Sequence, residues 1–170
     1  PQQFNDAPFT RVDFDGEAYV SQSKALALAA KAVGVKFIVH LSFAWAYGDQ
    51  HGAVVDESYK PNKSDAPTVK AAVDAENAIL KGQVPSAVLR LGFVYGGGSA
   101  ALESLMVTLR RGRFVPLDEA PVNWIHELDA AEAVRRVTEA MPAGEIFNVV
   151  DDTPVSTADF AAQFAQAMGL

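Results

Sequence analysis

A short apolar run that starts directly after a glycine constrains the fold of this chain more than any other feature. Residues 35–41 read VKFIVHL and are followed by Ser42, after which the chain opens into a loop. Apolar residues follow one another here without regular alternation, which is typical of a strand buried on both faces of a parallel sheet. Ligands of open parallel sheets bind beyond the carboxyl ends of the strands. We therefore expect function to depend on what stands at and after Ser42.

Composition excludes several classes of function. The chain has 170 residues, of which 49% are hydrophobic, so it is long and apolar enough for one folded domain with a core. Its net charge of -7 argues against sequence-independent nucleic-acid binding and against docking on anionic lipid. Cysteine is absent, which excludes disulfides and thiolate metal ligands. No apolar run approaches the ~20 residues of a membrane span, and no signal peptide is visible, so we expect a cytoplasmic or organelle-matrix location.

Helical and strand patterns alternate along the chain. We expect helices over residues 16–33, 65–81, 100–111, 128–141 and 156–168, and strands over residues 35–41, 86–91, 122–125 and 145–150. Residues 1–16 are expected to be an irregular lead-in to a domain over residues 17–170. Strands separated by helices are joined by right-handed parallel crossovers, so the fold class is α/β with a parallel sheet and flanking helices. Its first strand would have a bare edge, so we expect a sheet that is incomplete at its N-terminal side.

Five segments, taken in order, resemble motifs of the extended short-chain dehydrogenases, the NAD-dependent epimerase/dehydratase family. Residues 34–42 resemble the strand that leads into the catalytic serine, and residues 46–48 (AYG) resemble the motif "VYG". Residues 89–96 (LRLGFVYG) resemble "LRPGNVYG", residues 123–129 (NWIHELD) resemble "WIHVDD", and residues 147–151 (FNVVD) resemble "YNV". The resemblance implies the C-terminal half of a Rossmann-type NAD(P)-binding domain.

The resemblance also implies a cofactor, NAD or NADP, and a set of residues around it. The implied cofactor contacts are Ser42, Lys70, Gly92, Phe93, Val94 and Tyr95, and the implied substrate contacts are Arg113 and His126, near a small substrate lobe at about residues 112–126. The implied substrate is a nucleotide-sugar or a similar hydroxyl or carbonyl compound. The glycine-rich turn that seats the cofactor pyrophosphate in this family is absent from residues 1–170. We therefore expect cofactor binding to need an N-terminal half that these residues do not include.

The catalytic positions of the family are altered in this chain. Phe43 stands where the family has a serine or threonine. If Lys70 is the catalytic lysine of Tyr-x-x-x-Lys, then Ala66 replaces the tyrosine; a register shifted by two puts Thr68 and Ala72 at these two positions. In neither register is there a phenol to move a proton during hydride transfer. Ser42 remains a candidate catalytic or cofactor contact, with a strand-capping hydroxyl as the alternative.

A second Tyr-x-x-x-Lys pattern, Tyr59 to Lys63, has Pro61 in its middle. Because a proline there breaks the helix that the spacing requires, we interpret this pattern as a loop.

Two functional hypotheses follow from these residues. The first is an atypical NAD(P)-binding epimerase/dehydratase-like protein, which would act as an oxidoreductase or epimerase on a sugar nucleotide or similar compound. The second is a non-catalytic nucleotide-binding or scaffold subunit of a larger assembly. Family members often pair through two helices that correspond to residues 17–33 and 65–81 here, so the resemblance also implies a homodimer.

Overall fold

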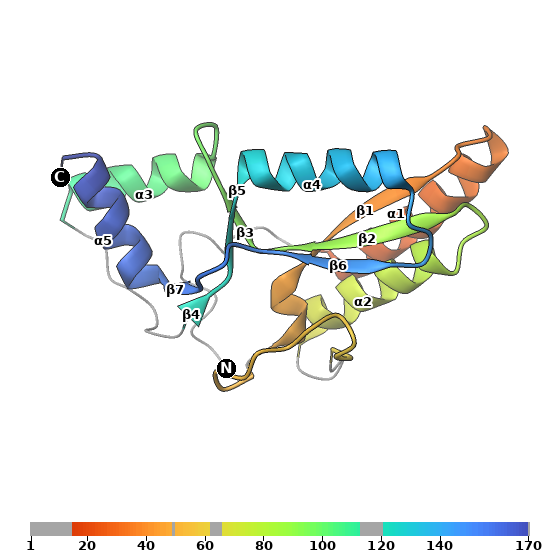
Figure 1. Cartoon of the computed structure of the whole chain (residues 1–170), viewed down its shortest axis with the longest axis horizontal. Helices are drawn as coiled ribbons and strands as arrows, with labels where there is room; N and C mark the ends of the chain where they lie inside the picture. Colours follow the sequence, from red (N-terminus) through yellow and green to blue (C-terminus); the bar gives the residue numbers. More distant parts are fainter. Residues whose placement is uncertain (1–14, 49, 62–65, 113–120, 170) are drawn as a thin grey trace.

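The fold was analysed in a computed structural model, which describes residues 15–48, 50–61, 66–112 and 121–169. Helices and strands alternate over most of this length (Figure 1). The helices are α1 (Gly16–Ala32), the 3-10 helix η2 (Ala44–Tyr47), α2 (Pro67–Leu80), α3 (Ala100–Arg110), α4 (Glu127–Ala140) and α5 (Thr157–Ala167). The strands are β1 (Ile38–Phe43), β2 (Ser86–Leu91), β3 (Phe93–Tyr95), β4 (Pro121–Val122), β5 (Trp124–His126), β6 (Ile146–Val149) and β7 (Val155–Ser156).

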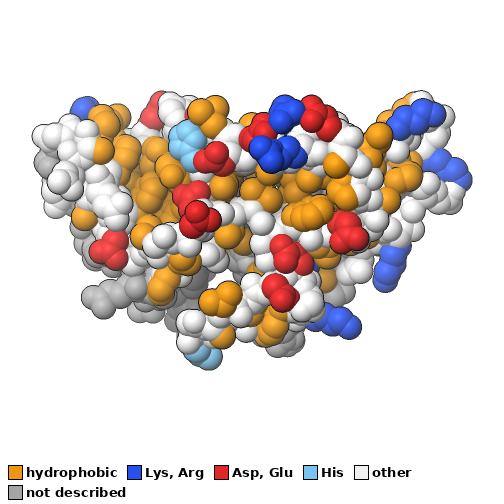
Figure 2. Space-filling view, in the orientation of Figure 1, with side chains coloured by type: hydrophobic (Ala, Val, Ile, Leu, Met, Phe, Trp, Pro, Cys, Tyr) orange, Lys and Arg blue, Asp and Glu red, His pale blue; other side chains and the backbone are white. Residues whose placement is uncertain are grey.

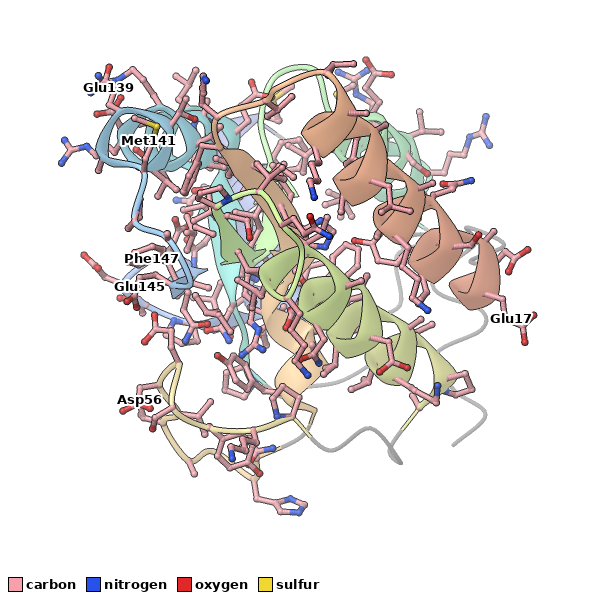
Figure 3. The ribbon with its side chains drawn as sticks, turned by 90° about the vertical axis from the view of Figure 1, so that its right-hand side faces the viewer. Glu17, Asp56, Glu139, Met141, Glu145 and Phe147 are labelled. Carbon is pink, nitrogen blue, oxygen red and sulfur yellow. The ribbon has the colours of Figure 1, made fainter. Side chains whose placement is uncertain are left out.

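The centre of the fold is a three-stranded parallel sheet in the order β1-β2-β6. In β1, Ile38 lies opposite Ser86 of β2, and in β2, Val88 lies opposite Ile146 of β6. The helices α1 and α2 lie side by side over one face of this sheet, and α4 lies across the other face (Figure 3). The expected α/β class, with a parallel sheet and flanking helices, is confirmed.

The core forms between β2 and the α1/α2 pair. Val88 and Leu89 in β2 and Ile79 in α2 are fully buried. The facing helix surfaces are made largely of alanine: Ala72 and Ala75 in α2 are fully buried, and Ala30 in α1 is nearly so. Small side chains allow the two helices to approach each other closely, and close packing gives this layer the density of a protein interior.

Two short ribbons extend the fold away from the main sheet. β3 pairs in parallel with β5, and β4 pairs in antiparallel orientation with β7. β3 follows β2 after a single residue, Gly92, so one nearly continuous segment runs from the sheet into the first ribbon. A Cβ atom at Gly92 would lie 2.7 Å from the carbonyl oxygen of Asn123, which means that only glycine allows this approach between the two segments.

Some boundaries differ from the sequence-based expectation. β1 begins three residues later than expected and runs past Ser42 to Phe43. β3 lies between the expected strand over residues 86–91 and the expected helix over residues 100–111, where no strand was expected, because Phe93–Tyr95 pairs with Trp124–His126. The expected strand over residues 122–125 is two short strands, and β7 was not expected. In the part of the chain that the structure describes, no helix combines the length and apolar character that crossing a bilayer requires.

Candidate functional site

A buried ionic network fixes the carboxyl end of β1. The hydroxyl of Ser42 donates a 2.6 Å hydrogen bond to Oε1 of Glu76, and Nε of Arg90 donates to the same oxygen at 3.0 Å. Nη2 of Arg90 lies 2.7 Å from Oε2 of Glu76, and both side chains are 3% exposed. The carboxylate is therefore held by a bidentate guanidinium and one hydroxyl, which is the geometry that makes a buried ion pair tolerable.

The network continues beyond the ion pair to the edge of the sheet. Nη1 of Arg90 donates to the hydroxyl of Tyr47 at 2.7 Å, and this hydroxyl donates to Oδ1 of Asn148 at 2.8 Å. The backbone N–H of Asn148 donates to the carboxylate of Glu57 at 2.7 Å. The loop over residues 50–61 is thereby connected to β6, and through Tyr47 and Arg90 to α2. The network thus holds η2, this loop, α2, β2 and β6 in one arrangement.

The two residues expected to be catalytic lie in different surroundings. Ser42 is 1% exposed, and its hydroxyl proton is used in the bond to Glu76. The side chain of Lys70 is 64% exposed, and its Nζ pairs with Asp74 one turn further along α2, an interaction that raises the pKa of Lys70. The structure does not bring these two side chains together. Their catalytic roles stay predictions. The hydroxyl of Ser42 bonds the side chain of Glu76 rather than nearby backbone, and β1 runs past Ser42, so a strand-capping role is not what the structure shows.

The two alignment registers for the missing tyrosine and lysine also differ in their surroundings. Ala66 is the N-cap residue of α2, and Lys70 follows it on the outer face of that helix. In the other register Thr68 is partly buried and Ala72 is fully buried. Neither pair places a phenol and an amine together at the start of α2.

A tyrosine that sequence reasoning did not select lies beside β1. The hydroxyl of Tyr19 lies 3.3 Å from Nε2 of His40 and donates to the carbonyl oxygen of Leu41 at 3.4 Å. Burial, and then the charge of Glu76, raises the pKa of Tyr19, while burial lowers the pKa of His40. Tyr19 thus keeps its proton at neutral pH, and His40 is a buried residue of β1.

An open cleft of about 950 Å³ lies between α3 and α5. Its floor is the β3–β5 ribbon, which contributes Tyr95, Trp124 and His126. Its walls come from α3, with Leu102 and Met106 among the lining residues, and from α5. Figure 1 shows α3 and α5 on the side of the molecule away from the three-stranded sheet, and Figure 2 shows hydrophobic side chains gathered between them with acidic side chains at the border.

Aromatic rings dominate the floor of this cleft and one of its walls. The rings of Trp124 and Phe160 are stacked, with centroids 3.9 Å apart and planes 8° from parallel. Tyr95 meets Phe160 edge to face at 5.2 Å, and it meets His126 in the same way at 5.2 Å. Phe164 lies next along α5, nearly parallel to Phe160. The indole N–H of Trp124 donates to the carbonyl oxygen of Val155 at 3.1 Å, which fixes the orientation of the stack.

Carboxylates complete the lining. The hydroxyl of Tyr95 donates to Oδ2 of Asp151 at 3.2 Å, and burial together with the Asp151 charge raises the pKa of Tyr95. Asp152 and Glu103 line the cleft as well, and both are exposed. Beside Tyr95, a carboxylate oxygen of Glu127 accepts a hydrogen bond from the backbone N–H of Gly97 at 3.0 Å. The cleft is thus an aromatic surface with a negatively charged border.

The residues that the resemblance implied fall into separate groups. Tyr95 and His126 line the cleft. Phe93 lies against Trp124 at the base of the ribbon, Gly92 lies directly before it, and Val94 is 45% exposed. Arg113 lies outside the described residues.

Sequence reasoning missed Phe160 and Asp151 as lining residues. The only signal for Phe160 was its place in an amphipathic helix, which is equally typical of a core residue.

Solved structures of known proteins show the fold class of this chain. It has the Rossmann-type fold of NAD-binding dehydratases, epimerases and reductases, as the sequence motifs indicated. Its structure is similar to a dTDP-4-dehydrorhamnose reductase ortholog from Clostridium acetobutylicum (TM-score 0.79, 21% identity, 95% of this chain and 59% of that one). It is also similar to a dTDP-glucose 4,6-dehydratase from Streptomyces venezuelae crystallised with NAD (TM-score 0.77, 20% identity, 91% and 51%).

A curated protein is similar in sequence. The relative is a 3-diazoavenalumate denitrifying reductase from a Streptomyces species. Its sequence is 29% identical to this chain over 180 residues, which cover 99% of this chain and 56% of the reductase. The chain therefore spans about half the length of the curated relative that it matches. No family model matches the chain.

Proposed function

We propose that this chain forms the substrate-binding half of a nicotinamide-dependent reductase, with its substrate in the cleft between α3 and α5. The observation that carries the proposal is the continuity of β2 and β3 through Gly92. In folds of this class the ligand lies beyond the carboxyl ends of the parallel strands. One backbone segment therefore joins the edge where a nicotinamide would lie to the floor of the cleft.

The residues at the carboxyl end of β1 fit a nicotinamide in part. Phe43 and Trp45 stack there with centroids 4.7 Å apart, and Trp45 is 36% exposed, so a flat apolar surface lies at the strand end. Such a surface suits an aromatic ring. The ribose and phosphates of the cofactor are polar, and neither Ser42, which is buried, nor Lys70, which pairs with Asp74, offers them a free group. Their binding would rest on residues outside those described.

Reduction is the direction that this chemistry favours. A reduced nicotinamide, when bound, supplies a hydride; the substrate gains this hydride and one proton from water, and the cofactor is left oxidised. Tyr95 keeps its proton at neutral pH, because its pKa is raised, so its hydroxyl can donate a hydrogen bond but cannot serve as a phenolate base. The relative whose name describes a reductase supports the same direction.

Cofactor binding by the complete protein tests the proposal. NADH and NADPH are titrated up to millimolar concentration while the unfolding temperature is measured, because a ligand of the native state stabilises it by mass action. We expect an upward shift that saturates for one of the two cofactors, and reduced binding in Trp45→Ala relative to Trp45→Phe, which keeps a stacked ring. A complete protein with no shift at millimolar cofactor would refute the proposal.

The experiment also bears on two alternatives, a nucleotide-sugar substrate and a non-catalytic role. A nucleotide-sugar substrate is suggested by the names of the solved structures, one of which was crystallised with UDP-glucose and NAD. A non-catalytic nucleotide-binding subunit is favoured by Phe43, which has no hydroxyl where the family uses one. Cofactor binding without hydride exchange, with nucleotide-sugars and small aromatic carbonyl compounds alike, would favour the non-catalytic subunit.

A further inference from the structure

We infer that the cleft between α3 and α5 takes an aromatic ligand that is neutral or positively charged, rather than a nucleoside diphosphate. The inference deepens the proposed function, since it names the class of substrate for the same site. The inference rests on the proposed function only where it calls the ligand a substrate, because binding of a ligand in the cleft can be measured without a cofactor.

The shape of the lining selects a flat apolar group. Phe160 and Phe164 lie one turn apart on α5 with ring planes 3° from parallel, and both are only partly buried. Met106 on α3 and Met168 after α5 add polarisable side chains to the opposing walls. Aromatic rings stack on such surfaces, and methionine sulfur makes favourable contacts with ring edges. A planar ring in the cleft would thus meet partners from both helices.

The charge of the lining selects against anions. Glu103, Asp151 and Asp152 contribute carboxylates from α3 and from the segment after β6, so negative charge borders the cleft on two sides. No lysine or arginine lines the cleft in the part of the chain that the structure describes. Arg110 and Arg111, which end α3, are exposed and lie outside the lining.

Three carboxylates at this border attract a cationic group and repel a diphosphate. A cation would also gain from the faces of the aromatic rings. The shape of the lining and its charge therefore both favour an aromatic ligand that is neutral or positively charged.

A matched series of small probes separates the two classes of ligand. Benzyltrimethylammonium, benzyl alcohol and phenylacetate share one ring and differ in charge, and UDP-glucose represents the nucleoside diphosphates. The readout is the part of the tryptophan fluorescence that a Trp124→Phe variant loses, because Trp124 lies in the cleft floor. We expect binding of the cation with a Kd on the order of 1 mM, weaker binding of the alcohol, and the weakest binding for phenylacetate and UDP-glucose.

Variants of the complete protein test which side chains of the lining determine probe binding. We expect Asp151→Asn and Glu103→Gln each to weaken cation binding about 3- to 10-fold, as expected for one charge nearby in a partly solvated site, and to strengthen phenylacetate binding. Phe160→Leu should weaken all three ring probes, and the cation most, because the cation also loses the face of an aromatic ring. Glu139→Gln on the exposed end of α4 is the control and should change nothing.

The outcomes are distinct for the two proposals. Tighter binding of UDP-glucose than of the aromatic cation, or no binding of any ring probe, overturns the inference. If the charge variants leave the order of the probes unchanged, the electrostatic argument is overturned. Ring probes that bind in the expected order to a protein that binds neither NADH nor NADPH support the inference while the proposed function fails.

Discussion

Removing one member of the buried pair between Glu76 and Arg90 is expected to cost a large part of the stability of the fold. The carboxylate accepts three hydrogen bonds from Ser42 and Arg90, and both charged side chains are 3% exposed. Arg90→Met leaves a buried carboxylate with the Ser42 hydroxyl as its remaining partner. Breaking a buried pair in this way costs about 3–5 kcal/mol, about a fifth or more of the ~5–15 kcal/mol by which domains are stable. Glu76→Met instead leaves the guanidinium with the Tyr47 hydroxyl as its remaining partner and should cost a similar amount.

A double-mutant cycle decides whether the cost comes from the stranded charge. We expect the double variant Glu76→Met with Arg90→Met to be less destabilised than the sum of the two single changes by about 2 kcal/mol or more, because neither charge remains buried alone. Urea unfolding followed by circular dichroism measures each free energy, and an unchanged m value shows that the unfolded state is comparable.

Two further variants give reference values for the free energies of unfolding in this cycle. Ser42→Ala removes one hydrogen bond to a charged acceptor and should cost about 1.5–3 kcal/mol. Glu139→Gln, which loses an exposed pair with Arg135 on α4, should leave the urea midpoint nearly unchanged. Single changes that cost less than about 1 kcal/mol, or a double variant that is simply additive, would refute the reasoning.

Three further predictions concern other parts of the molecule. Gly92→Ala places a Cβ atom 2.7 Å from the carbonyl oxygen of Asn123 and should destabilise the fold by about 1–3 kcal/mol, measured as a lower urea midpoint; a variant as stable as the parent would contradict the close approach. Burial lowers the pKa of His40, so the unfolded chain binds more protons as pH falls below ~6.5 and stability decreases there; His40→Gln should show a smaller loss between pH 7 and pH 5 than the parent. Hydrogen bonds from Arg135 and Arg136 lower the pKa of Glu132 to about 2. The stabilisation from this exposed pairing is therefore present above pH ~4.3 and is lost as pH falls to about 2. NMR titration of Glu132 should find a pKa of about 2, and high salt should raise this pKa.

Much of the fold was predictable because local patterns agree with the tertiary structure. The strand over residues 86–91 was placed correctly, since a mostly apolar run between a proline and a glycine leaves little choice of boundaries. The helix that begins after Ser156 was also predicted, because its side chain caps the helix by accepting from the N–H of Asp159. β3 was missed because its three residues become a strand only by pairing with β5, which lies thirty residues further along the chain and leaves no local signal.

The site was less predictable than the fold. Sequence reasoning gave Glu76 no role in the site, yet it holds Ser42 and Arg90 together. A buried charge in a helix cannot be distinguished from an exposed one by residue type when each turn also contains small apolar residues. Asp151 and Phe160 come together with Tyr95 only through the packing of α5 against the ribbon. Spacing along the chain does not encode such a contact.

The single residue between β2 and β3 also affects how this fold can be redesigned. Gly92 joins a rigid sheet, in which the buried ion pair lies, to a ribbon that supports α3 and α5. Stability and ligand choice therefore depend on different sets of side chains on the two sides of one short connection. New specificities could be grafted by exchanging residues 99–110 and 156–168 while the segment over residues 86–95 is kept unchanged.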